Sequence, residues 1–356
     1  MTVWSIPLRG IRGKTPRFKL MDDLFPDKAN GEDWKKAYIH DSRPIVDEVW
    51  GTEIHIPTLQ GISINHYEYK GDDISAKLSG EYDFAHMMPH LPAIFSEIVI
   101  DDSYWKAPYM PDYPHHNDSE KYSTINSQSG TLITALRLIG FNRCIAPFFL
   151  KNSTLKNALN CEDGEIELMM NHPFQIPMAA FPPDKSKSRI TQNELQWIGR
   201  AMRTMNRLFY EEKNDFTATM TAMNYYYGDI PVRAKMTIIW AGIEDLLRPK
   251  GSVRCGVRSR AAMILGRTND EIEEYFSFVG KLYDKRNSAS HGKRFAWTHG
   301  IEDILKNEDA QLDLLALMDS YQLLCDIFYC IVDRGNRFSD EELLSLEEQY
   351  KEMFPE

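Results

Sequence analysis

Residues 281 to 295 read KLYDKRNSASHGKRF, and the pattern that leads into them decides the fold of the second half of the chain. Apolar residues recur there at steps of three and four, which is the spacing of one face of an α-helix. The next inward position on that face is Arg286. A guanidinium at an inward position must be paired, be solvated in a cleft or have a functional role, because an unpaired buried charge is too costly to keep. The apolar members of the stripe are Ile272, Tyr275, Val279 and Leu282.

Helical periodicity continues over most of residues 190 to 356. Capping-box signatures, in which Ser or Thr precedes an acid by three residues, mark expected helix starts. The sequence therefore predicts an all-α bundle over residues 190–356. The capping pairs are Thr191 with Glu194, Thr268 with Glu271, and Ser339 with Glu342.

The first half of the chain shows a strand-like pattern instead of helical periodicity. Short β-branched and aromatic runs, separated by Gly, Asp and Pro turns, fill the range from residue 45 to about 105 and predict strands. A polar spacer at 111–130 separates them from GTLITALRLIGF, an expected helix, and from two further strand-like runs. We expect an α+β protein with a β-rich domain at 1–125, a connecting α/β segment at 126–189, and the helical bundle.

Charge is spread unevenly along the chain. The formal net charge is -11, which argues against a protein that binds polyanions over its whole surface. Residues 231 to 294 nevertheless hold 13 Lys and Arg against 7 Asp and Glu. A local basic surface on an acidic protein suits a phosphate site, although helical faces often reach such an excess with no function attached.

Neither a metal site nor a membrane segment is expected. The 5 cysteines form no CxxC pair and fit reduced thiols of a cytosolic protein. His86 and His90 have the spacing of a metal pair, but Pro89 between them interrupts the helix they would need. His115 and His116 fall in the polar spacer. No apolar run suggests a signal peptide or a membrane span, so the expected location is the cytoplasm.

The run LYDKRNSASHG, preceded by IIWAGIEDLL and the arginine-rich VRCGVRSRAAMILG, resembles the HEPN superfamily of helical bundles, and specifically its Apea-like branch. The signature of that family is Arg, a polar residue, three more residues and His, often followed by Gly. Arg286, Asn287 and His291 match it position by position. The resemblance covers roughly residues 125 to 335 and is strongest from 235 to 295.

The resemblance implies a ribonuclease that needs no metal and no cofactor. Catalysis is expected from Arg286, Asn287 and His291. A His can move a proton near neutral pH, and an Arg can stabilise the charge that develops on phosphate. Attack by the ribose 2′-hydroxyl would leave a 2′,3′-cyclic phosphate. RNA contacts are expected from Lys285, Lys293, Arg294, Arg258 and Arg260, with Glu244 and Tyr283 in support.

Spacing limits how one chain could build such a site. An offset of five places Arg286 and His291 roughly 140° apart on an ideal helix, so they share no face unless the helix ends between them. HEPN proteins commonly pair with their motifs facing each other, which implies a homodimer with a composite cleft. The resemblance also suggests an effector of anti-phage or abortive-infection defence, a toxin that cuts RNA, with tRNA as one candidate. A phage component or a partner protein at the N-terminal domain would be its trigger.

Each of these residues also has a purely structural interpretation. Arg286 near a helix C-terminus could interact with the last carbonyls and the helix dipole, and His291 before Gly292 could cap that helix. Lys285, Lys293 and Arg294 could form a solvated face. Glu244 could be a surface acid or could pair with Arg286. The alternative function is a non-catalytic HEPN adaptor that dimerises or binds a nucleotide.

Overall fold

The computed structural model describes part of the chain in detail. The described residues are 4–8, 53–55, 62–68, 94–101, 118–140, 148–151, 167–170, 192–226, 231–250, 252–290 and 308–355. They fall into two compact units. The first comprises Met1–Gln175 with Pro183–Arg203, and the second comprises Ile176–Pro182 with Thr204–Glu356.

The first unit contains six described strands in one sheet, in the order β2-β3-β4-β1-β5-β6, and every neighbouring pair is antiparallel. The longest pairing joins β3 to β4, with Ile62 opposite Ile100. Most of residues 1–125 lie outside the described part, so a β-rich domain over that whole range stays a prediction. The strands are β1 (Trp4–Leu8), β2 (Glu53–His55), β3 (Ile62–Glu68), β4 (Ile94–Ile100), β5 (Phe148–Lys151) and β6 (Glu167–Met170).

Helix α5 (Asp118–Leu138) lies in the same unit and confirms the helix expected at GTLITALRLIGF. It begins earlier than predicted, inside the stretch expected to be a polar spacer. Where it enters the predicted segment, Thr131 and Thr134 donate their hydroxyl protons to the carbonyls of Ser127 and Gly130, four residues back. The prediction of a spacer at 118–130 was therefore wrong.

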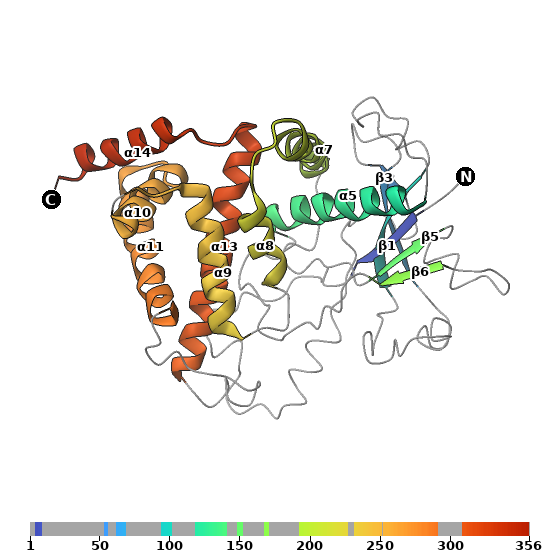
Figure 1. Ribbon diagram of the computed structural model, residues 1–356, viewed down its shortest axis with the longest axis horizontal. Helices are drawn as coiled ribbons and strands as arrows, with labels where there is room; N and C mark the ends of the chain where they lie inside the picture. Colours follow the sequence, from blue (N-terminus) through green and yellow to red (C-terminus); the bar gives the residue numbers. More distant parts are fainter. Residues whose placement is uncertain are drawn as a thin grey trace. The chain divides into compact units, whose positions relative to one another are not determined.

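From residue 192 onward the described residues form eight helices, which confirms the all-α prediction for this region (Figure 1). Helix α7 divides between the two units, because the first unit ends at Arg203. The helices are α7 (Gln192–Asn206), η2 (Arg207–Glu211), α8 (Thr217–Tyr225), α9 (Val232–Leu247), α10 (Val253–Leu265), α11 (Asn269–Ser290), α13 (Glu308–Arg334) and α14 (Asp340–Met353).

Capping explains where two of these helices start. Ser339 caps α14 with a full capping box: its hydroxyl accepts the Glu342 N–H at 3.1 Å, and the Glu342 carboxylate accepts the Ser339 N–H at 2.7 Å. Thr268 accepts the Glu271 N–H at 3.3 Å, but the Glu271 carboxylate accepts from Arg267 instead. The predicted box at Ser339 and Glu342 is thus confirmed, and the one at Thr268 and Glu271 is half formed. Thr191 lies outside the described residues.

The core of the bundle lies between α9 and α13, which run side by side in Figure 1. Trp240 of α9 is fully buried and donates its indole N–H to the Ser320 hydroxyl of α13 at 3.1 Å. Helix α8 packs closely on α9, since a Cβ at Gly242 would lie only 2.9 Å from the Ala222 Cβ. These contacts hold α9 rigidly, and α9 supplies one side of the site described next.

One helix of the described part is long and apolar enough to cross a membrane, over Leu312–Arg334 within α13. Most of it is buried inside the bundle, and the core helix of a soluble protein passes the same test. The sequence expectation that no segment approaches a membrane span was therefore wrong on length and composition. The cytoplasmic location stays a prediction.

Candidate functional site

Helix α11 carries the Arg286 motif, and its apolar stripe fixes which way Arg286 points. Ile272, Val279 and Leu282 are buried in the bundle, as the spacing predicts. Arg286 follows them on the same face and keeps a side chain that is only 22 % exposed. The stripe therefore turns a charged group inward at the C-terminal end of a helix.

Arg286 is paired. Its Nη2 lies 2.9 Å from Glu244 Oε1 of α9, which is 25 % exposed, and its Nη1 donates to Asn287 Oδ1 at 3.2 Å. The contact with Glu244 lacks the alignment of a hydrogen bond, and buried Arg286 Nε has no hydrogen-bond partner among the described residues. Charge attraction is thus satisfied while hydrogen-bonding capacity remains.

Tyr283 backs this pair from the core. Its ring meets that of Trp240 edge-on at 5.3 Å between centroids, and the Arg286 guanidinium carbon lies 5.5 Å from its ring centre. This distance is within the range of a cation–π contact. Tyr283 and Glu244 therefore lie where the sequence expects supporting residues, beside Arg286.

Lys285 contacts an acid that the sequence analysis did not single out. Its Nζ lies 2.8 Å from Asp313 Oδ1 on α13, and Asp313 is almost completely buried. The Lys285 side chain remains 38 % exposed. An RNA phosphate at Lys285 would have to compete with that carboxylate.

Arg260 does not fit the RNA contact predicted for it. Its side chain is 2 % exposed and pairs with Glu347 of α14 at 3.0 Å. The same guanidinium donates to the carbonyls of Leu247 and Arg248 at 2.8 and 2.6 Å. All of these partners are internal, so the position corrects the prediction: Arg260 joins α9, α10 and α14.

Arg258 is also engaged inside the fold. Its Nε donates to the Phe276 carbonyl at 3.1 Å, and its guanidinium carbon lies 3.7 Å from the centre of the Phe276 ring. It crosses α11 at Gly280, where a Cβ would lie 2.7 Å from the Arg258 Nε. Arg258 thus joins α10 to α11. To contact RNA as predicted, it would have to bind a phosphate as well as hold these two helices together.

The remaining predicted residues are not placed. Helix α11 is described to Ser290, and His291, Lys293 and Arg294 lie outside the described residues. The geometry between Arg286 and His291 is therefore untested. His86, His90, His115 and His116 also lie outside, and within the described segments no three His, Cys, Asp or Glu side chains could hold a metal ion.

Most described cations of the basic window have internal partners. Several of these partners, Asp313, Asp340 and Glu347, come from outside residues 231–294 and so were invisible to a charge count over that window. The pairs are Lys235 with the Tyr226 carbonyl, Arg248 and Lys250 with Asp340, Arg254 with Asp284, Arg258 with Phe276, Arg260 with Glu347, Lys285 with Asp313, and Arg286 with Glu244.

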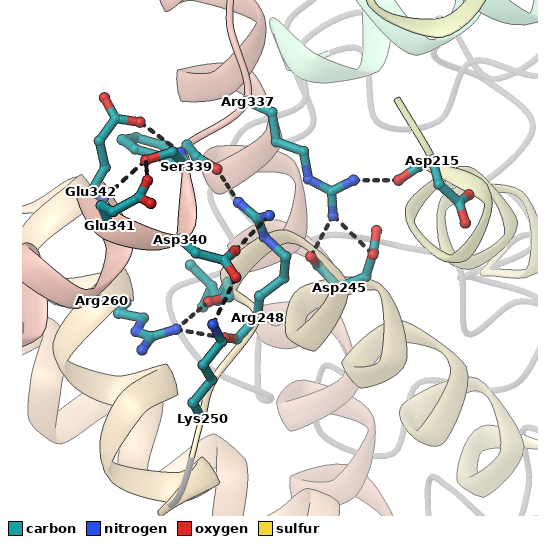
Figure 2. Close-up of polar contacts among 12 residues, drawn as sticks. Asp215, Asp245, Arg248, Lys250, Arg260, Arg337, Ser339, Asp340, Glu341 and Glu342 are labelled. Atoms are coloured by element: carbon teal, nitrogen blue, oxygen red, sulfur yellow. Dashed lines mark hydrogen bonds and ion pairs between the residues drawn. The ribbon is translucent and has the colours of Figure 1, made fainter. Parts of the chain in front are cut away.

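A second ionic group, which we term the α14 cluster, joins the end of α9 to the turn before α14 (Figure 2). Arg337 donates to the Asp245 carbonyl at 2.6 Å, to the Asp245 carboxylate at 2.9 Å, and to the Asp215 carbonyl. A hydrogen bond from Lys250, followed by the charge of Arg248, holds the pKa of Asp340 below its ordinary value. The members of the α14 cluster are Asp215, Asp245, Arg248, Lys250, Arg337 and Asp340.

Comparison with known proteins adds no relative: no protein-family model, curated protein or solved structure matches this chain. The likeness to HEPN bundles therefore rests on the quoted motif and its context alone.

Proposed function

We propose that this protein is a metal-independent RNA endonuclease of the HEPN type. It would cut RNA by attack of the ribose 2′-hydroxyl on the adjacent phosphate, leaving a 2′,3′-cyclic phosphate and a 5′-hydroxyl. DNA lacks this hydroxyl and would not be cut.

The observation that carries the proposal is the placement of Arg286. It lies at an inward position near the C-terminal end of α11 in an all-α bundle, 2.9 Å from Glu244, and five residues before His291. Glu244 and Tyr283 orient the guanidinium, and its Nη1 donates to Asn287. An oriented cation suits a phosphate whose charge grows during reaction.

The three motif residues divide the chemistry. Arg286 stabilises the negative charge on the pentacoordinate phosphate. His291 moves the proton of the 2′-hydroxyl, because imidazole titrates near neutral pH. Asn287, whose side-chain oxygen accepts from Arg286 at 3.2 Å, orients the guanidinium or the phosphate.

Two copies of the chain would form the working site. A homodimer through the HEPN bundle brings two motifs together, which resolves the spacing problem between Arg286 and His291. The N-terminal unit is then a sensor that restrains the nuclease until a phage component or a partner protein binds. In this role the protein is a toxin-like effector of anti-phage defence in the cytoplasm.

RNA ends from cells that express the protein test this proposal. We expect new 5′-hydroxyl ends in the wild type and none with His291→Ala, and purified protein should cleave RNA in excess chelator. Cuts clustered in tRNA anticodon loops would identify a toxin that blocks translation. Wild-type protein that leaves RNA intact under every trigger, or that strictly needs a divalent ion, would contradict the proposal.

A second candidate is a non-catalytic HEPN adaptor that dimerises or binds a nucleotide. It is favoured by the internal pairing of the described basic residues, since Arg260, Arg258 and Lys285 are all engaged within the fold. An adaptor would be harmless when expressed, whereas the nuclease would be toxic in a way that His291→Ala abolishes.

A further inference from the structure

We propose that Arg233 of α9 binds a phosphate of the RNA beside the Arg286 motif. This inference rests on the proposed function. It adds a binding residue from α9, the helix in which Glu244 was the only predicted site residue. Arg233 is a cation beside the motif with which no described acid forms an ion pair.

Arg233 reaches the end of α11 that carries the motif. Its Nε donates to the Ala289 carbonyl at 2.5 Å. Ala289 lies in the last turn of α11, three residues after Arg286, where helix carbonyls lack intrahelical partners. The hydrogen bond thus fixes the Arg233 guanidinium at the place where the chain continues toward His291.

Arg233 differs in charge balance from the cations around it. Lys285, Arg286 and Arg254 each lie within 3 Å of a carboxylate. Arg233 is exposed, and no acid within the described segments forms an ion pair with it. The first turn of α9 contains no acid either. Among the residues that the structure describes, its charge therefore has no acidic partner.

The chemistry of the guanidinium suits a phosphate. Donation from Nε to Ala289 leaves the four N–H groups of Nη1 and Nη2, which can bind two phosphate oxygens at once. Because the carbonyl already orients the group, less side-chain freedom is lost when RNA binds. A lysine would keep the charge without this fork.

Salt dependence of RNA binding tests the role directly. A fluorescent single-stranded oligoribonucleotide is titrated with full-length His291→Ala protein, which cannot cut it, over a range of salt concentrations. Adding Arg233→Ala should raise Kd about tenfold and reduce the slope of log Kd against log salt by about 0.7, the value for one lost phosphate contact on a single strand. Arg233→Lys should recover part of both.

Arg267→Ala is the matched control. Arg267 is also exposed, but it precedes the first turn of α11, so the part of α11 from Asn269 to Arg286 separates it from the motif. That length is about 27 Å at the rise of an α-helix. The control loses the same charge and should leave the slope unchanged.

The outcomes separate this inference from the function on which it rests. If the His291→Ala protein binds RNA and Arg233→Ala leaves the slope equal to that of Arg267→Ala, the Arg233 proposal is overturned and the nuclease stands. Weaker binding with an unchanged slope would assign Arg233 a purely structural role at the helix end and would also overturn it. Absence of any RNA binding and cleavage would overturn both.

Discussion

Two groups of arginines in the same bundle use their donors in opposite ways. In the α14 cluster Arg337 has acceptors on both Asp245 and Asp215, and nearby Arg260 has a carboxylate and two carbonyls (Figure 2). At the C-terminal end of α11, Arg286 donates one hydrogen bond, to Asn287, besides its ion pair with Glu244, and Arg233 donates one, to the Ala289 carbonyl. Arg337 and Arg260 donate three hydrogen bonds each within the fold, so the first group is tied to the fold through more of its donors than the second.

The largest expected effect is the loss of RNA cleavage when Arg286 is replaced. Arg286→Ala should reduce RNA cleavage by about 10²–10³-fold, the cost of removing one oriented group that stabilises transition-state charge. Its unfolding transition should change little, and Glu244→Gln in the same chain should restore any stability lost by leaving Glu244 unpaired. Cleavage rate and thermal unfolding are measured on each variant.

Arg337→Ala is the opposite case in the same experiment. It removes contacts to Asp215 and Asp245, so we expect a lower unfolding midpoint and an unchanged cleavage rate per folded molecule. If Arg286→Ala unfolds as readily as Arg337→Ala, Arg286 belongs with the structural arginines and the proposed site loses its main support.

The next effect concerns stability alone. Arg260→Ala leaves two carbonyls without their partner and leaves Glu347 with Lys351 alone, which should lower the free energy of unfolding by about 3 kcal/mol. Lys351→Ala is the control, because Lys351 pairs with the same Glu347 from the exposed surface and its loss should be hardly measurable. Denaturant unfolding decides between them, and equal losses would refute the structural role of Arg260.

The smallest effect contrasts two carboxylates. Cations lower the pKa of Asp340, whereas burial raises the pKa of Asp319 on α13 to about 6. Because folding raises the pKa of Asp319, the contribution of this side chain to the free energy of unfolding is most favourable below pH 4. That contribution is lost as pH rises through 6. Asp319→Asn should therefore stabilise the protein at pH 7.5 by about 1–2 kcal/mol and have little effect at pH 4.

Unfolding at the two pH values tests this sign. The same gain at both would show that Asp319 is unfavourable for a reason other than its charge.

Local patterns predicted the helices well because their causes are local. The stripe from Ile272 to Leu282 and the capping box at Ser339 depend on residues within one or two turns, and both are confirmed. The pair between Arg286 and Glu244 was one of several alternatives in the sequence, and the structure selects it.

Charge partners distant in sequence could not be predicted. Arg260 was predicted to contact RNA, but it is buried and pairs with Glu347, 87 positions later. Asp313 neutralises Lys285 in the same way. Arg233 carries no motif, and only the packing of α9 against α11 places it beside Ala289. A charge count along the chain measures composition. A binding surface depends on which cations stay exposed and without an acidic partner after the chain has folded.

Gly280 has a consequence for how this protein can vary. Its missing side chain leaves the room through which Arg258 crosses α11, because a Cβ there would lie 2.7 Å from Nε and 3.0 Å from Cζ of that arginine. Homologous chains that share this helix pair should therefore change both positions together: a larger residue at 280 should accompany a shorter one at 258. We therefore expect an alignment of such homologues to show the two positions covarying, although they lie 22 positions apart in the sequence.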